Sequence, residues 1–338
     1  MRIDVPARHP FVIVMRDDSA HCVHELTGRL AARSRVPRAH LVTTVRAKYL
    51  RFQQEVRDGL RQAMARPDGV TFHVADPVAL ERAVRSRVGE RALISLDPLV
   101  AHAHGHLRLS RGFLLGGGRS VGLVARPGAP RIADQLAALR ARLAGAECAL
   151  VEDDVCTGGS VEAATRLLRA AGIRVAHVVP GIRLTAPGGA STTGVPMHPV
   201  IDYRMPRSGA VDLTDSRNYL LGMSGLAVRL PRRQWGRAPY WLPFVSAASR
   251  IGISPGMERA FAKGMLEANA RFFTEVERTA RYRIRVGDLC PGGRRLLTSL
   301  EIAWTSTPVL AVLEQLASSP DRYVEIVQRA KEREVEGR

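Results

Sequence analysis

The chain has 338 residues and 46% of them are apolar, which is enough for a globular protein with one elaborated domain or with two. Its net charge is +18, but only three of the 50 basic residues are lysines, and the arginines are spread along the chain, so the charge alone is weak evidence for nucleic-acid binding. The four cysteines have no paired spacing, and we find neither a signal peptide nor an apolar run of membrane-spanning length, so we expect a cytoplasmic protein without a disulfide scaffold, a zinc knuckle or a membrane partner.

The N-terminal residues 1–75 are predicted to form an αβ extension. Phe11–Met15 is a short apolar run typical of a strand, and Leu50–Ala65 has the spacing of an amphipathic helix that ends before a Pro-Asp-Gly turn. From residue 76 to residue 205, strand and helix patterns alternate. This alternation predicts an α/β fold with a doubly wound parallel sheet.

Two segments in the first half of this region end in polar residues. Ala92–Leu96 is a predicted strand that ends at Asp97-Pro98, and Arg119–Arg126 is a predicted strand that leads into a Gly/Pro-rich segment closing at Arg131. Between them, His102, His104 and His106 alternate in the sequence. They would share one face of a strand and could there bind a transition metal, whereas on a helix they would diverge, and the sequence leaves their role open.

The most informative segment is Cys148–Ser160, which has the pattern of a strand, an acidic turn and a helix start. Cys148–Val151 is typical of a strand buried on both faces, and Glu152-Asp153-Asp154 is expected where that strand ends. Thr157–Ser160 is a predicted turn, after which apolar residues recur at helical spacing. A second β-branched run, Ile173–Val179, completes a predicted βαβ unit.

The residue types of this segment indicate the chemistry of a ligand. Backbone N–H groups and hydroxyls of Thr157–Ser160 at a helix N-terminus suit a phosphate monoester, while the carboxylates just upstream suit sugar hydroxyls and a divalent cation. A P-loop would need a Lys beside Ser160, and a dinucleotide-binding turn would place its glycines directly after the strand. The sequence matches neither pattern.

The segment Val151–Ser160, Val-Glu-Asp-Asp-Val-Cys-Thr-Gly-Gly-Ser, resembles the ribose-phosphate motif of the type I phosphoribosyltransferases. The resemblance covers about residues 146–180. It implies that Mg²⁺ and 5-phosphoribosyl 1-pyrophosphate bind here, that Glu152 and Asp153 hold the ribose hydroxyls and the metal, and that Cys156–Ser160 hold the 5-phosphate. The loop residues in this implied substrate site are Asp154, Cys156, Thr157, Gly158, Gly159 and Ser160.

The same resemblance assigns roles to the two upstream segments. Asp97 and Pro98 would begin the pyrophosphate loop, and Arg126 and Arg131 would belong to a mobile catalytic loop whose cations neutralise pyrophosphate. An ordinary surface loop with solvated arginines is the alternative for the second segment. Cys156 departs from the acid or hydroxyl that the family places near the acceptor base, and without a nearby His in the sequence it is more simply a small turn residue than a nucleophile.

Residues 206–338 are predicted to form a mostly helical hood or second domain that carries acceptor specificity. Helical spacing recurs over Met257–Glu277 and over Leu296–Leu316. Asp212, Asp215, Arg217, Asn218 and Tyr219 form a polar cluster in the sequence, for which helix capping is the alternative reading. Tyr240, Trp241 and Phe244 would either stack on an aromatic acceptor or pack in the core.

Three functions stay open at this point. The first is Mg²⁺-dependent transfer of phosphoribose from 5-phosphoribosyl 1-pyrophosphate to a small acceptor such as a nucleobase-like or specialised metabolite, with release of pyrophosphate. The second is a phosphoribosyltransferase-fold regulator that senses the donor and uses its basic surface on nucleic acid, and the third is cleavage of a phosphoribosyl bond. The upstream segments favour the enzyme. We also expect a homodimer as one alternative to a monomer.

Overall fold

The computed structural model describes residues 1–4, 11–64, 69–97, 100, 102–115, 120–143, 145–185, 194–204, 211–242, 245, 251–320 and 324–329. The chain divides into two compact units, and each unit is built from several segments. The first unit contains residues 1–16, 70–111 and 123–213, and the second contains residues 17–69, 112–122 and 214–338. The predicted boundaries at residues 75 and 205 follow the chain linearly, whereas these units interleave.

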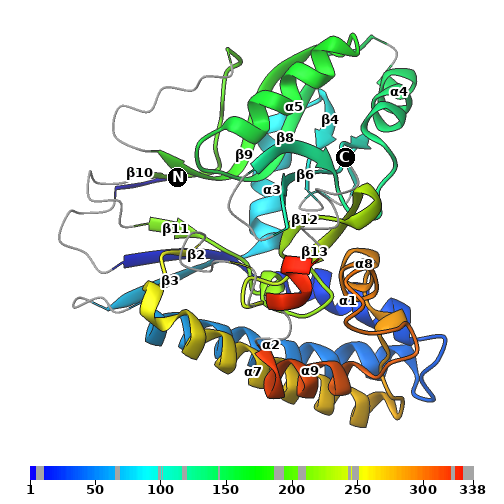
Figure 1. Ribbon diagram of the computed structural model, residues 1–338. Coiled ribbons are helices and arrows are strands. Elements are labelled where there is room, and N and C mark those ends of the chain that lie inside the picture. Colours follow the sequence, from blue (N-terminus) through cyan, green and yellow to red (C-terminus); the bar gives the residue numbers. More distant parts are fainter. Residues whose placement is uncertain are drawn as a thin grey trace. The chain divides into compact units, whose positions relative to one another are not determined.

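The first unit is an α/β structure with a parallel six-stranded sheet, in the order β1-β10-β9-β8-β4-β5 (Figure 1). Every pair of neighbouring strands in this sheet is parallel. The strands are β1 (Arg2–Asp4), β4 (Ala92–Ser95), β5 (Gly105–His106), β8 (Cys148–Val155), β9 (Val175–Thr185) and β10 (Ile201–Arg204). The predicted α/β class with a parallel central sheet is therefore confirmed.

Helices cover both faces of this sheet, as a doubly wound arrangement requires. The helices are α3 (Pro77–Val88), α4 (Ile132–Leu143) and α5 (Gly159–Ala170). Ala149 and Val151 of β8 belong to the hydrophobic cluster that includes α3, whereas Cys148 and Leu150 belong to the cluster that includes α4 and α5. Because side chains alternate along a strand, β8 is buried on both faces, as its apolar run predicted.

A second, three-stranded parallel sheet also belongs to the first unit, in the order β11-β2-β3. Its strands are β2 (Phe11–Arg16), β3 (Val70–Ala75) and β11 (Val211–Leu213). The strand predicted at Phe11–Met15 is confirmed as β2. Val12 and Val14 of β2 and Val211 of β11 join the same hydrophobic cluster as Ala149 and Val151, so the two sheets share one core.

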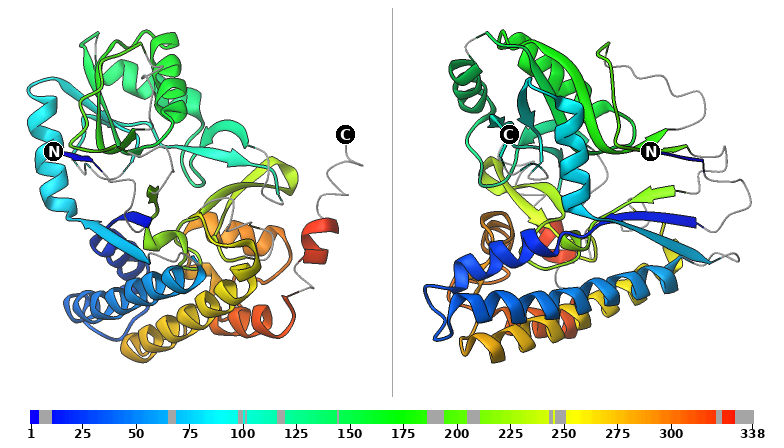
Figure 2. Two further views of the ribbon diagram at one scale, coloured as in Figure 1. Left: turned by 90° about the vertical axis from the view of Figure 1, so that its left-hand side faces the viewer. Right: turned by 180° about the vertical axis from the view of Figure 1, so that it is seen from behind.

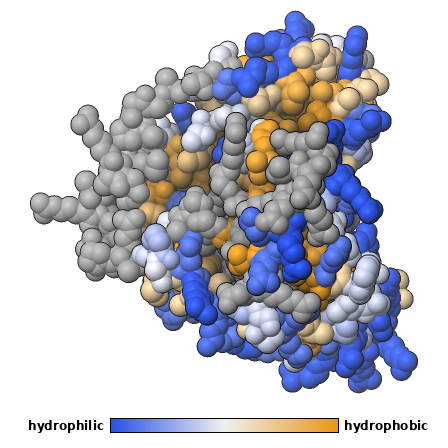
Figure 3. All heavy atoms as spheres, in the orientation of Figure 1, coloured by the Kyte–Doolittle hydropathy of each residue, from blue (hydrophilic) through white to orange (hydrophobic). Residues whose placement is uncertain are grey.

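The second unit consists mainly of helices, together with the β12–β13 hairpin. Figures 1 and 2 show its two longest helices, α2 and α7, lying alongside one another. In Figure 3, hydrophilic residues predominate on the outward side of this helical layer. The elements are α1 (Ser19–Leu30), α2 (Arg38–Ala63), β12 (Leu226–Leu230), β13 (Gln234–Ala238), α7 (Glu258–Ala280), α8 (Pro291–Ser299) and α9 (Val309–Ser318).

Aromatic side chains fill the space between α2 and α7. Tyr49 and Phe52 of α2 contact Phe272 of α7, with ring centroids 6.1 and 5.7 Å apart, and all three rings are buried. The helix predicted over Met257–Glu277 is confirmed as α7, whereas the helix predicted over Leu50–Ala65 is the second half of α2, which begins at Arg38. Two strands, β6 (Leu109–Phe113) and β7 (Ser120–Ala125), contribute residues to both units and complete a third sheet in the order β13-β12-β6-β7.

Among the described residues, no helix combines the length and the apolarity that crossing a bilayer requires.

Candidate functional site

The six-stranded sheet of the first unit has a topological switch point between β4 and β8. The two strands pair with each other, with Ser95 opposite Val151. The strands that follow them in the chain are added on opposite sides of this pair: β5 pairs with β4, and β9 pairs with β8. In open α/β sheets, ligands bind outside the carboxyl ends of the strands at such a point. Asp97, just beyond β4, and Asp153, in the last residues of β8, both lie at this edge.

A buried network of charged groups joins these two carboxylates. Nη2 of Arg16 lies 2.5 Å from Oδ2 of Asp153, and Nη1 of the same guanidinium lies 3.5 Å from Oδ1 of Asp97. The side chains of Arg16 and Asp97 are only 8% and 7% exposed, and that of Asp153 only 11%. A buried carboxylate without a cation would be costly, so Arg16 lets both acids stay charged at this edge of the sheet.

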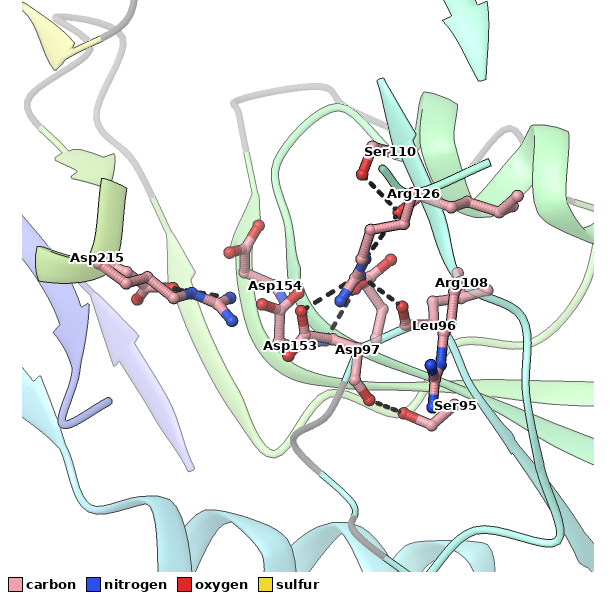
Figure 4. A network of polar contacts seen from close by, with 12 residues as sticks. Ser95, Leu96, Asp97, Arg108, Ser110, Arg126, Asp153, Asp154 and Asp215 are labelled. Carbon is pink, nitrogen blue, oxygen red and sulfur yellow. Dashed lines mark hydrogen bonds and ion pairs between the residues drawn. The ribbon is translucent and has the colours of Figure 1, made fainter. Parts of the chain in front are cut away.

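Arg126 reaches the same carboxylate of Asp97 from the end of β7. Its Nη2 lies 3.5 Å from Oδ2 of Asp97 and donates a hydrogen bond of 2.8 Å to the carbonyl oxygen of Leu96. Figure 4 shows the Arg126 guanidinium directed at Leu96 and Asp97, with Asp153 beside them. The structure thus brings together Asp97, Asp153 and Arg126, three of the residues that the sequence analysis selected, while Pro98 lies outside the described residues.

Arg16 is the member of the network that the sequence analysis missed. It ends β2, and strand alternation places it on the same face as Val12 and Val14, which pack in the cluster that contains Val151. Asp153 lies two residues after Val151 and faces the same way. The only local signal is an arginine at the end of an otherwise apolar strand, where a buried cation needs a partner.

The acidic residues continue β8 instead of ending it. The strand extends to Val155, because β9 pairs with it as far as Val155 and Arg183. Burial raises the pKa of Glu152, and the neighbouring carboxylates of Asp153, Asp97 and Asp154 raise it further. The Asp153 N–H donates to Oε1 of Glu152 over 3.1 Å. The pKa of Glu152 is therefore raised both by its burial and by the acids around it.

The turn between β8 and α5 has the backbone of an anion-binding site. Gly158, the residue before α5, has φ of 78° and ψ of −10°, a left-handed conformation that favours glycine. As the N-cap residue, Gly158 has no side chain that could cap the helix beginning at Gly159. The N–H groups of a first helical turn have no partners within the helix, and together with the helix dipole they attract an anion.

Arg111 adds a cation to this turn. Its Nη2 lies 3.4 Å from Oγ of Ser160, at the start of α5. Thr157 and Gly159 are exposed and Ser160 is partly exposed, so the turn is open to a ligand from solvent. The turn therefore presents backbone donors, hydroxyls and one guanidinium, which is the donor set that a phosphate monoester requires.

The carboxyl group of Asp212 acts electrostatically on Cys156 in this turn. Burial raises the pKa of the Cys156 thiol, Asp212 and Asp154 raise it further, and Arg111 opposes them. Burial also raises the pKa of Asp212 to about 6. A thiol with a raised pKa is a poor nucleophile, which agrees with the sequence-based reading of Cys156 as a turn residue.

Other predicted residues lie away from the network. The Arg131 side chain is 90% exposed and lies 3.5 Å from Asp134 in a surface ion pair. His106 lies on β5, and Nδ1 of His104 accepts a hydrogen bond of 3.0 Å from the Leu93 N–H. Within the described part of the chain, no three His, Cys, Asp or Glu side chains gather in a way that could hold a metal ion.

Tyr240 and Trp241 belong to the second unit. Trp241 is 2% exposed, and its Nε1 donates a hydrogen bond of 2.7 Å to the carbonyl oxygen of Tyr219. Tyr240 is partly exposed and packs edge-on against the Tyr219 ring at 5.7 Å. Core packing, the alternative that the sequence left open, therefore accounts for Trp241. Phe244 lies outside the described residues.

We expect Trp241→Phe to lower the free energy of unfolding by about 1–3 kcal/mol, because a buried carbonyl loses a hydrogen-bond donor. Asn269 also donates to the Tyr219 carbonyl, over 2.9 Å, and this second bond keeps the loss at the lower end of that range. Native-state hydrogen exchange of the α7 amides in the variant and the wild type measures the difference within this unit. An unchanged free energy of unfolding would show that the indole N–H contributes nothing to the second unit.

Comparisons of the chain with protein-family models, with curated proteins and with solved structures find no match. The function therefore has to be argued from the site itself.

Proposed function

We propose that the first unit binds 5-phosphoribosyl 1-pyrophosphate together with Mg²⁺ and transfers its phosphoribosyl group to a small acceptor. The observation that carries this proposal is the meeting of two features at one sheet edge. Asp97 and Asp153 are joined by Arg16 at the switch point, and β8 leads directly into the uncapped glycine turn of α5. The carboxylates that would bind the sugar lie at the end of β8, and the backbone N–H groups that would bind the phosphate lie in the turn that follows it.

The 5-phosphate would bind at the turn from Cys156 to Ser160. Its oxygens would accept from backbone N–H groups of the first turn of α5, from the hydroxyls of Thr157 and Ser160, and from Arg111. Gly158 supplies the left-handed backbone that this turn requires. The phosphate would fix the position of the ribose, which holds the anomeric carbon close to the acceptor.

The ribose hydroxyls would lie against the acidic end of β8. The carboxylate oxygens of Asp153 and Glu152 would accept hydrogen bonds from the hydroxyls. Arg16 is a positioning residue in this scheme, since it holds Asp153 charged and fixed in one orientation. The transition state of the transfer carries positive charge on the sugar, which a nearby carboxylate stabilises.

The residues at this site are better suited to an Mg²⁺ ion that binds together with the donor than to an Mg²⁺ ion that the protein holds on its own. No cluster of three side-chain ligands occurs among the described residues, and Arg16 already occupies Asp153. Mg²⁺ commonly binds through one or two carboxylates together with substrate phosphates. Glu152 and Asp153 are the residues that would contact it, and the ion would supply neutralisation of the pyrophosphate charge.

The leaving group and the acceptor would use residues on either side of the ribose. Arg126 follows β7 directly, lies 3.5 Å from Asp97 and would contact a pyrophosphate bound beyond β4. The acceptor nitrogen or hydroxyl would attack the anomeric carbon as the bond to pyrophosphate breaks, and its proton would pass to the carboxylate of Asp212. This role fits Asp212 because its charge acts on Cys156, the position where the resembling family carries an acid.

Pyrophosphate release tests this proposal. The donor and Mg²⁺ are incubated with a panel of nucleobases and nitrogen heterocycles, and we expect release with at least one acceptor. Donor binding without release across a broad panel would instead favour a sensor of the donor. Release that needs no acceptor would favour cleavage of the phosphoribosyl bond.

With a productive acceptor, the rate should rise as the pH increases through about 6, because Asp212 accepts a proton only when it is ionised. Asp212→Asn should lower the rate and abolish this rise. An identical pH profile in that variant would show that Asp212 does not accept the proton. That result would concern only the acceptor side of the site and not donor binding. Donor titrations of the same variant separate the two questions, since donor affinity should stay at the wild-type value.

A further inference from the structure

The β12–β13 hairpin of the second unit has one buried face and one partly exposed face. Gly236 faces inward, where a Cβ atom would lie 2.7 Å from the Leu230 side chain and 3.2 Å from Leu296 of α8. On the other face, Arg229 lies directly opposite Trp235, and Arg237 lies opposite Ala227 in the next pair. All three long side chains are partly exposed. Because β13 is the end strand of its sheet, this face adjoins a free sheet edge.

The tip of the hairpin presents two further arginines in an unusual backbone conformation. Arg232 and Arg233 have φ of 58° and 55°, a region that favours glycine and asparagine, and both side chains are exposed. A left-handed conformation costs a non-glycine residue about 1–2 kcal/mol. An Asn-Gly pair would adopt this turn with less steric strain. The presence of two arginines instead indicates a functional role for their side chains.

The hairpin segment itself supplies no acidic residue to balance its arginines. The segment from Leu226 to Ala238 contains four arginines and no acidic residue. Within the described part of the chain, neither Arg232 nor Arg233 lies within ion-pair distance of a carboxylate. On the long helices several basic residues are paired with acids: Lys48 and Arg51 contact Glu275, and Arg271 contacts Glu55. The hairpin is therefore a local concentration of positive charge, in addition to the positive net charge of the whole chain.

We propose that the β12–β13 hairpin binds single-stranded nucleic acid. Arg232 and Arg233 would contact successive phosphates, and a base would stack on Trp235 between Arg229 and Arg237. A partly exposed indole flanked by guanidinium groups on a sheet surface suits an unpaired base, whose flat face is accessible only when the strand is single. An acidic peptide would use the arginines but would leave the indole without a role. This inference is independent of the donor site in the first unit.

Fluorescence anisotropy with a labelled single-stranded DNA of about twelve nucleotides tests the proposal, because that length spans the usual site. We expect saturable binding that Arg232→Gln/Arg233→Gln weakens about 10-fold or more. Loss of two phosphate contacts should also reduce the slope of log affinity against log salt by about 1.4. Trp235→Leu should weaken binding about 10-fold with an unchanged salt slope, since stacking releases no counterions.

The matched control is Arg35→Gln/Arg38→Gln, which removes the same charge from two exposed positions of the second unit. We expect this variant to bind within about 2-fold of the wild type. Equal weakening by the control and the hairpin variant would overturn the proposal, because binding would then follow net charge alone. It would also be overturned if duplex DNA or polyglutamate competed as well as the single strand. Circular dichroism of Trp235→Leu shows whether that variant is folded, and the exposed arginine variants carry the test if it is not.

Discussion

Arg16→Met should destabilise the first unit by about 3–5 kcal/mol, because it leaves Asp153 buried without its cation. The side chain that replaces Arg16 has a similar length and no charge, so packing changes little and the electrostatic loss dominates. Arg126 still faces Asp97, so the cost falls mainly on Asp153. Native-state hydrogen exchange of the β8 amides measures this loss within one unit, which a global transition of a two-unit chain does not.

Two comparisons make this prediction specific. Arg166→Met breaks an exposed ion pair with Glu162 and should change the stability by at most about 0.5 kcal/mol. Adding Asp153→Asn to Arg16→Met should recover part of the loss, because the unpaired charge is then gone. If Arg16→Met alone stays within about 1 kcal/mol of the wild type, the buried pair between Arg16 and Asp153 does not contribute to the stability of the first unit as expected.

Asp153→Asn should weaken binding of 5-phosphoribosyl 1-pyrophosphate by about 100-fold, equivalent to about 3 kcal/mol. The amide keeps the size of the carboxylate but loses the charge that accepts hydrogen bonds from ribose hydroxyls and faces the positive sugar of the transition state. Isothermal titration calorimetry with donor and Mg²⁺ measures the affinity. Hydrogen exchange of the same variant shows how much of the loss comes from the broken pair with Arg16.

Asp134→Asn is the matched control for this substitution. Asp134 lies on α4 in an exposed ion pair with Arg131 and outside the buried network, so the same chemical change should leave donor affinity unchanged. If Asp153→Asn binds the donor as tightly as the wild type does, the end of β8 does not hold the ribose. A parallel loss in both variants would indicate that the effect is one of overall charge.

Local patterns were sufficient to predict the elements around the candidate site. Turn residues at Thr157–Ser160 followed by apolar residues at helical spacing predicted α5, and both signals lie within one short stretch of chain. The end of β8 was less predictable. Acidic residues are unfavourable in strands, but β9 offers backbone partners as far as Arg183, and these hydrogen bonds carry β8 through Glu152 and Asp153 to Val155.

Pairing between distant segments could not be predicted from the sequence. Arg16 and Asp153 are far apart in the chain, and nothing local marks one as the partner of the other. The same limit applies to the three-stranded sheet, in which β2 pairs with both β3 and β11 and so joins the N-terminal segment to the first unit. The predicted domains were consecutive ranges of the chain, and they therefore differ from the two units of the structure, each of which combines several separate segments. Trp241 likewise resembles a ligand-stacking residue in sequence, while its hydrogen bond to Tyr219 is a property of the folded core.

The most direct test of a phosphate-binding site at the β8–α5 turn follows the backbone amides of that turn. Amide resonances of ²H,¹⁵N-labelled protein are recorded by TROSY NMR during titration with ribose 5-phosphate, and then with 5-phosphoribosyl 1-pyrophosphate and Mg²⁺. We predict saturable shifts at Gly158, Gly159 and Ser160 with both ligands, and further shifts at Asp97 and Asp153 with the second. Saturable binding that leaves these amides unmoved, or the absence of binding by either ligand, would contradict the proposed site.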